Sequence, residues 1–88
     1  MAKVEIYTKD YCPYCKRAKY LLTTKGVSFE EYDVTNDAAG QRDMIQRSER
    51  RTVPQIFIDG YHVGGSDDLI EANRTGQLDQ LLAGKTAA

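Results

Sequence analysis

Cys12-Pro13-Tyr14-Cys15 is the stretch that decides the fold, because it lies where a predicted strand passes into a predicted helix. Before it, Val4 to Thr8 form a short apolar run that is typical of a β-strand. After it, apolar side chains recur at helical spacing up to Lys25. Pro13 suits the first position of a helix, where its missing N–H would have no partner. We therefore expect a helix whose N-cap is Cys12.

This placement makes a thiol reactive. The first N–H groups of a helix lack partners, and the N-terminus carries about half a positive charge, so both stabilise a thiolate. Thiols at such sites have a pKa of roughly 3.5 to 7.5, against roughly 8.5 for a free cysteine. Cys12 and Cys15 are also the only cysteines. The pair predicts a thiol–disulfide oxidoreductase in which Cys12 is the attacking thiolate.

The composition predicts one small soluble domain. The chain has 88 residues, of which 41% are hydrophobic and 28% charged. We expect a single domain over 1–84 and a flexible tail over 85–88. The formal net charge of −1 provides no field that would recruit nucleic acid or a membrane surface.

The compartment is inferred from the N-terminus and the cysteines. A strand begins by Val4, so the sequence predicts neither a signal peptide nor a membrane span. Two cysteines are too few for the disulfide framework of a small secreted protein. We expect a reducing compartment, the cytoplasm.

The middle of the chain predicts a strand and a helix. Val27 to Val34 is interpreted as a strand, and Asn36 or Asp37 as the cap of a helix that ends near Ser48. The expected apolar side chains of this helix are Ala39, Met44 and Ile45. The arginines toward and past its end are interpreted as a solvated face, namely Arg42, Arg47, Arg50 and Arg51.

The last third predicts a hairpin and two helices. Asp59-Gly60 between two β-rich runs is a strong hairpin signal. Ser66 is the expected N-cap of the next helix, with Asp67 and Asp68 against its positive end. The expected apolar side is Leu69, Ile70 and Ala72. A break at 73–76 precedes a short helix over 77–83.

The resulting order is β-α-β-α-β-β-α followed by a short helix. A βαβ unit joined to a ββα unit forms one mixed four-stranded sheet with helices on both faces, so the predicted fold class is α/β.

Zinc is the main competitor for the cysteine pair, since C-x-x-C is also half of a zinc site. Structural zinc takes four ligands, and the chain offers two cysteines and His62 alone. We expect no metal, and we interpret His62 as a structural or surface residue.

Two further elements each allow two interpretations. Pro54 precedes an apolar strand, and its peptide bond is either an ordinary trans bond or a cis bond that presents the Val53 backbone. The segment from Gly64 to Asp67 is either a plain loop before a capped helix or a place where a carboxylate meets bare N–H groups.

Taken in order, these motifs resemble the glutaredoxin family, in particular the small dithiol glutaredoxins of bacteria. The resemblance extends from Val4 to Leu82. The motifs that carry the resemblance are residues 7–9, 12–15, 52–58 and 64–68. It implies the thioredoxin fold and a cis Pro54 that faces the redox pair.

The resemblance also implies glutathione as the co-substrate. Lys9, with Arg50 as a further candidate, would contact the glycine carboxylate, and Tyr14 would line the site. The implied contacts of the cysteinyl and γ-glutamyl parts come from Thr52, Val53, Pro54, Gly65, Ser66 and Asp67. The implied protein partners are glutathionylated proteins and proteins with disulfides, which a monomer would reduce.

Two positions depart from the commonest family pattern. Tyr11 precedes the nucleophile where a small hydroxyl residue is frequent, and Ser66 stands where some relatives have a third cysteine. Two rival functions remain open at this point: a thioredoxin-like enzyme served by a flavoprotein reductase, and a dimeric carrier of a glutathione-ligated iron–sulfur cluster.

Overall fold

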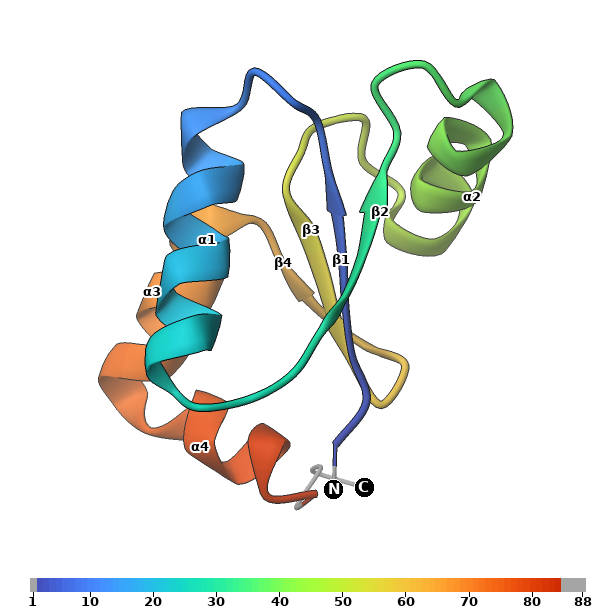
Figure 1. The fold of residues 1–88 in the computed structure, drawn as a ribbon. Coiled ribbons are helices and arrows are strands. Elements are labelled where there is room, and N and C mark those ends of the chain that lie inside the picture. Colours follow the sequence, from blue (N-terminus) through green and yellow to red (C-terminus); the bar gives the residue numbers. More distant parts are fainter. Residues whose placement is uncertain (1, 85–88) are drawn as a thin grey trace.

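β1 (Val4–Thr8) is the strand around which the sheet is built (Figure 1). In the computed structural model, which describes residues 2–84, β1 pairs in parallel with β2 (Glu30–Asp33). On its other side β1 pairs antiparallel with β3 (Gln55–Ile58), which in turn pairs antiparallel with β4 (Tyr61–Gly64). The order β2-β1-β3-β4 confirms the mixed four-stranded sheet.

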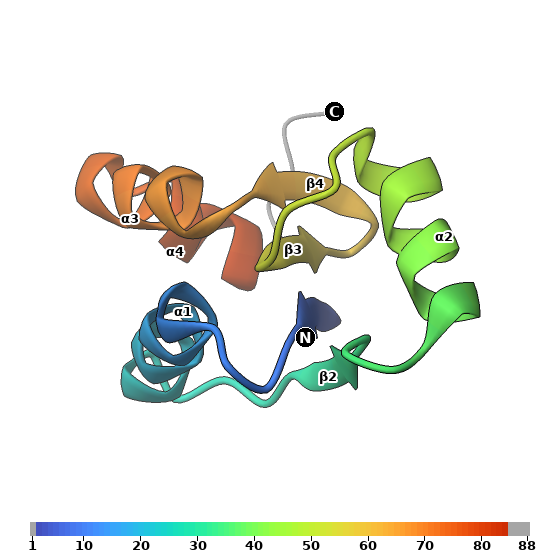
Figure 2. The same ribbon diagram turned by 90° about the horizontal axis from the view of Figure 1, so that it is seen from above.

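Helices cover both faces of this sheet, as predicted (Figure 2). α1 (Pro13–Thr24), α3 (Ser66–Thr75) and α4 (Gln77–Leu82) lie on one face. α2 (Ala38–Ser48) lies on the other. The element order and the sheet confirm the thioredoxin-like α/β fold.

The core has two parts because side chains alternate between the faces of a strand. Ile6 and Ile56 face α1 and α3, whereas Tyr7 and Phe57 face α2. The larger part consists of Val4, Ile6, Ala18, Leu22, Ile56, Ile58, Leu69, Ala72, Leu78 and Leu81. The smaller part consists of Tyr7, Val34, Met44 and Phe57.

The second strand is shorter than predicted. It covers Glu30–Asp33 rather than Val27 to Val34, and it is an edge strand with mostly exposed side chains. Val27 and Phe29 pack against the larger core part without strand pairing, so their apolar character reflects burial rather than a β-ladder.

The third helix begins one residue earlier than predicted. Its N-cap is Gly65, not Ser66, and the Gly65 N–H donates to Oδ2 of Asp68 at 2.9 Å. Ser66 is instead the first helical residue. The helix also runs through the predicted break to Thr75 and ends at Gly76, whose φ of 86° suits glycine.

Several predicted exposures are wrong. Arg47 is not solvated, because its guanidinium lies 4.0 Å from the Phe57 ring centroid and pairs with Glu5. Arg42, Arg50 and Arg51 are exposed, as predicted, although Arg50 also pairs with Asp68. Two predicted core side chains, those of Ala39 and Ile70, are exposed.

Two local predictions are confirmed. Asp37 caps α2, accepting from the Gly40 N–H at 2.9 Å. Asp59 and Gly60 both have positive φ, which the tight hairpin requires. Within residues 2–84, no helix is long and apolar enough to cross a membrane. The predicted tail over 85–88 lies outside the described residues.

Candidate active site

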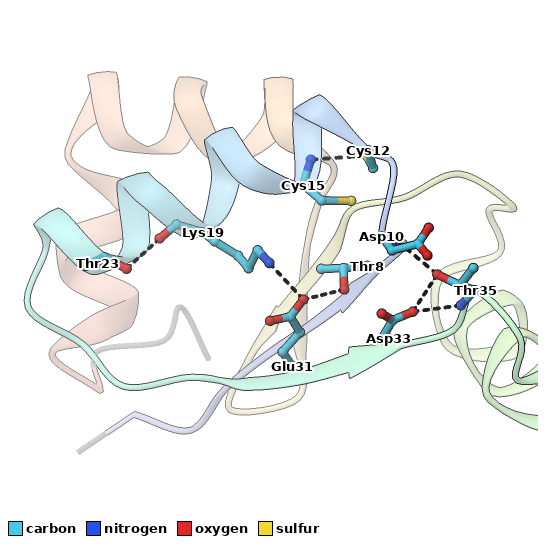
Figure 3. A network of polar contacts seen from close by, with 9 residues as sticks. All are labelled: Thr8, Asp10, Cys12, Cys15, Lys19, Thr23, Glu31, Asp33 and Thr35. Carbon is cyan, nitrogen blue, oxygen red and sulfur yellow. Dashed lines mark hydrogen bonds and ion pairs between the residues drawn. The ribbon is translucent and has the colours of Figure 1, made fainter.

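The two cysteines lie at the N-terminus of α1, and both are free thiols. Cys12 is the N-cap, as predicted, with an extended backbone. Its sulfur accepts a hydrogen bond from the Cys15 N–H at 3.1 Å (Figure 3). This is the contact that stabilises a thiolate at a helix start.

Cys15 lies deeper, and the chemistry of the two thiols differs accordingly. Only 1% of Cys15 is exposed. Burial, with the hydrogen bond to Cys12 adding to it, raises the pKa of Cys15 to about 12. Cys15 is therefore a neutral thiol at pH 7, which leaves Cys12 as the thiol placed to attack.

The loop before Cys12 is held to the edge of the sheet (Figure 3). The Asp10 N–H donates to Oγ1 of Thr35 at 2.9 Å, and Thr35 donates to Asp33. These bonds tie the loop between β1 and α1 to the segment that follows β2. The position of the nucleophile is thereby fixed from both sides, by this loop and by α1.

A second network lies beside α1 (Figure 3). Oε2 of Glu31 accepts from Oγ1 of Thr8 at 2.6 Å and from Nζ of Lys19 at 2.9 Å. The Thr8 hydroxyl, foremost among the causes, holds the pKa of Glu31 below its usual value. Lys19 is thus ion-paired with Glu31, and its charge also acts to lower the pKa of Cys15.

A groove of about 230 Å³ opens next to this pair. It is lined by Tyr14, Arg50, Thr52, Val53, Pro54, Gly65, Ser66, Asp67 and Asp68. The Val53–Pro54 bond is cis, as the family resemblance implies. The Val53 carbonyl lies 3.7 Å from the Cys12 sulfur, so the groove and the nucleophile share this residue.

One end of the groove is the N-terminus of α3. Ser66 is buried, and within the described chain its hydroxyl has no hydrogen-bond partner. Asp67 is exposed beside it. Asp68 is held by Arg50 and by the Gly65 N–H, and these contacts, Arg50 first, lower its pKa. Among residues 2–84, therefore, nothing pairs with the Ser66 hydroxyl or the Asp67 carboxylate, which lie side by side at this end.

The structure thus brings together most of the predicted contact residues but not all of them. Lys9 does not line the groove; it is half-buried directly after β1, and its main-chain N–H acts to lower the pKa of Cys15. Tyr11 and Tyr14, which flank the nucleophile, are 70% and 57% exposed.

Two residues in or behind the groove had no predicted role in the site. Asp68 was assigned only to the helix dipole. Gln55 is 0% exposed although it is polar, and its amide bonds to Thr52. The sequence signal for Gln55 is a polar residue directly before the apolar residues of a buried strand.

His62 is half-buried on β4 and bonds to Gln55 through Nε2. Burial, with the charges of Arg50 and Arg47, lowers its pKa. Within residues 2–84, no three His, Cys, Asp or Glu side chains form a group that could hold a metal ion.

Known proteins match both the sequence and the fold. The glutaredoxin family model matches residues 4–63. Glutaredoxin 3 of Escherichia coli is 60% identical over 82 residues, which cover 93% of this chain and 99% of that protein. A probable glutaredoxin of Synechocystis is 53% identical over 83 residues, which cover 93% of this chain and 76% of that one.

Solved structures agree. A glutaredoxin from Brucella melitensis has a TM-score of 0.87 at 46% identity, covering 100% of this chain and 96% of its own. A buckwheat glutaredoxin–glutathione complex has a TM-score of 0.86 at 32% identity, covering 96% and 79%. The chain belongs to the glutaredoxin family, and with Cys12 and Cys15 it is a dithiol glutaredoxin, a glutathione-dependent thiol–disulfide oxidoreductase.

Proposed function

We propose that Cys12 is the nucleophile, that Cys15 is the resolving thiol, and that the groove beside them holds glutathione. The observation that carries this proposal is the shared position of Val53, which lines the groove and also contacts the Cys12 sulfur. A tripeptide thiol bound along the groove would have its sulfur next to Cys12.

The polar groups of the groove suit the two ends of glutathione. The γ-glutamyl carboxylate lies at the N-terminus of α3, where the free Ser66 hydroxyl and main-chain N–H groups receive it. The Asp67 carboxylate pairs with the γ-glutamyl ammonium. The cysteinyl part pairs with the Val53 main chain in the manner of an added strand, between Thr52 and Pro54.

The other end requires a cation for the glycine carboxylate. Arg50 lines the groove from the α3 side, where it pairs with Asp68, and its long side chain is the further candidate for this carboxylate. Lys9 is the second cation assigned to this end, and Tyr14 forms the wall nearest the nucleophile.

The first step is a thiol–disulfide exchange. The Cys12 thiolate attacks the glutathione sulfur of a glutathionylated protein. The protein–glutathione S–S bond breaks, the protein leaves as a thiolate, and Cys12 carries glutathione as a mixed disulfide.

The second step regenerates the enzyme by one of two routes. A second glutathione thiolate attacks the bound glutathione sulfur, which forms glutathione disulfide and frees the Cys12 thiolate. Alternatively, Cys15 loses its proton and attacks Cys12, so that glutathione leaves and the two cysteines form a disulfide. Burial raises the pKa of Cys15, so the second route must also remove this proton, whereas the first route does not use Cys15.

The substrates follow from this chemistry. We assign glutathionylated proteins and disulfide-containing proteins as substrates, a monomer as the active form and the cytoplasm as the compartment.

Glutathione-coupled reduction of a glutathionylated peptide tests the proposal, with thioredoxin reductase as the competing electron donor. We expect turnover with glutathione and glutathione reductase, no turnover with thioredoxin reductase, and loss of activity in Cys12→Ser. Equal turnover with both donors, or activity that survives Cys12→Ser, would overturn it.

A further inference from the structure

We propose that Gln55 and His62 are positioning residues, which orient the Thr52–Val53 peptide group so that its N–H faces the groove. The inference rests on the proposed function, in which the Val53 main chain receives glutathione. Neither side chain lines the groove, so both act through Thr52.

The orientation of the Gln55 amide is fixed by its partners. Its Nε2 donates to the carbonyl oxygen of Thr52 at 3.0 Å and to Thr52 Oγ1 at 3.1 Å. A carbonyl oxygen can only accept, so the nitrogen of the amide must face Thr52. The amide oxygen then faces His62, whose Nε2 lies 2.7 Å away and must donate. Hydrogen bonds thus run from His62 through Gln55 to Thr52.

Packing holds the histidine ring in place. His62 pairs with Phe57 across β3 and β4, and the two rings stack at 4.9 Å between centroids and 29° between planes. The charged groups that act on the ring are Arg47 and Arg50, which oppose its protonation, and Asp68, which favours it. The Nε2–H that bonds to Gln55 is present in both the neutral Nε2–H tautomer and the imidazolium. The hydrogen bond from His62 to Gln55 therefore does not depend on protonation of the ring.

The consequence for the groove follows from peptide geometry. Within residues 2–84 the only cis bond is Val53–Pro54, so the Thr52–Val53 bond is trans. In a trans peptide the C=O and N–H point in opposite directions. The Thr52 carbonyl faces the buried Gln55 amide, and the Val53 N–H therefore points away from the core, toward the groove that Thr52 and Val53 line.

The same segment is held at its other end. The Ser48 hydroxyl accepts from the Arg50 N–H at 3.0 Å, at the point where α2 gives way to the loop. With Gln55 fixing Thr52, the main-chain donor of Val53 is ordered before substrate binds. Ordering it in advance lowers the cost of binding rather than the barrier of the chemical step.

The test uses the full chain and compares kinetic constants with nucleophile reactivity. Gln55→Met keeps the length of the side chain and removes both donors. His62→Phe keeps an aromatic ring on Phe57 and removes the donor, whereas His62→Gln restores a donor near the same place. The measurements are KM and kcat for a glutathionylated peptide, and the rate at which iodoacetamide alkylates Cys12.

For Gln55→Met we expect KM to rise about tenfold, the effect of losing one or two good hydrogen bonds, with kcat and the alkylation rate unchanged. His62→Phe should raise KM by a smaller factor, and His62→Gln should return it toward the wild-type value across the pH range. If Gln55→Met does not fold, the comparison of KM between His62→Phe and His62→Gln tests the inference by itself.

An unchanged KM in folded variants would overturn the inference. A loss of activity that is fully explained by lower kcat and slower alkylation of Cys12 would also overturn it. A KM for His62→Gln as high as that for His62→Phe would do the same. If the wild-type protein itself shows no saturable glutathione-dependent turnover, the proposed function fails, and that result is distinct from any of these.

Discussion

Cys12 and Cys15 are three positions apart in sequence and differ sharply in environment. Cys12 accepts the Cys15 N–H at the start of α1, whereas Cys15 is buried and its thiol pKa is raised. The two thiols lie one helical turn apart. The sulfur of Cys12 accepts a main-chain N–H, which favours its thiolate, whereas Cys15 stays protonated. This difference assigns attack to one and resolution to the other.

The division of roles predicts the behaviour of Cys15→Ser. The variant should keep deglutathionylation of a peptide, because the glutathione route does not use Cys15. It should lose efficient reduction of a protein disulfide, which needs the second thiol. Parallel assays with the two substrates check this, and loss of both activities would contradict the mechanism.

At the scale of the element, the α3 N-terminus shows what glycine permits. Gly64 has a φ of +123°, and a Cβ there would lie 2.3 Å from Oδ2 of Asp68. Gly65 has a φ of −89°, and a Cβ there would meet the Pro54 carbonyl at an ordinary 3.5 Å. The first glycine is required by the backbone, whereas the second keeps the groove open.

The two glycines therefore predict opposite phenotypes. Gly64→Ala should lower the free energy of unfolding by about 1–3 kcal/mol, the usual cost of such a backbone conformation. Gly65→Ala should cost less than about 1 kcal/mol, as for a weaker N-cap, yet raise KM for the glutathionylated peptide. Denaturant titration and steady-state kinetics separate the two effects, and equal loss of stability would contradict this account.

The elements also show where sequence reasoning reaches its limit. The positions of Cys12, Asp37 and the Asp59-Gly60 turn could be predicted because each depends on a local rule. The N-cap of α3 could not, since Gly65 is capped by Asp68, three residues later, and not by its own side chain. The length of β2 could not either, because Val27 and Phe29 are apolar for packing and not for strand pairing.

At the scale of the whole molecule, one ion pair joins the sheet to α2. Arg47 donates to both oxygens of Glu5 and lies over the Phe57 ring. No local sequence pattern predicts an ion pair between residues 42 positions apart. The arginine cluster therefore suggested solvation, although Arg47 in fact covers the smaller core part.

This pair predicts a pH dependence of stability. The hydrogen bond from Arg47, the largest cause, holds the pKa of Glu5 below 4.5 despite partial burial. A lowered folded-state pKa stabilises the protein above the unfolded pKa, and that stabilisation is lost as the pH falls through the folded value. Wild-type stability should therefore decline more steeply in acid than that of Glu5→Gln.

Glu5→Gln should also lower stability at pH 7 by about 1–2 kcal/mol, since it weakens a charge-assisted pair that is mostly buried. Glu71→Gln is the matched control, because its partner Arg74 is exposed and such pairs contribute little. Urea unfolding between pH 3 and pH 7 checks both. Identical pH profiles for Glu5→Gln and the wild type would contradict the assignment.

The central claim is that Cys12 takes glutathione, and not the protein, from a mixed disulfide. Cys15→Ser, which cannot resolve the adduct, should be mixed with a peptide that carries isotopically labelled glutathione, acid-quenched and analysed by mass spectrometry. We expect one labelled glutathionyl group on Cys12 and release of the peptide as a free thiol. A peptide–Cys12 disulfide with free labelled glutathione would contradict it.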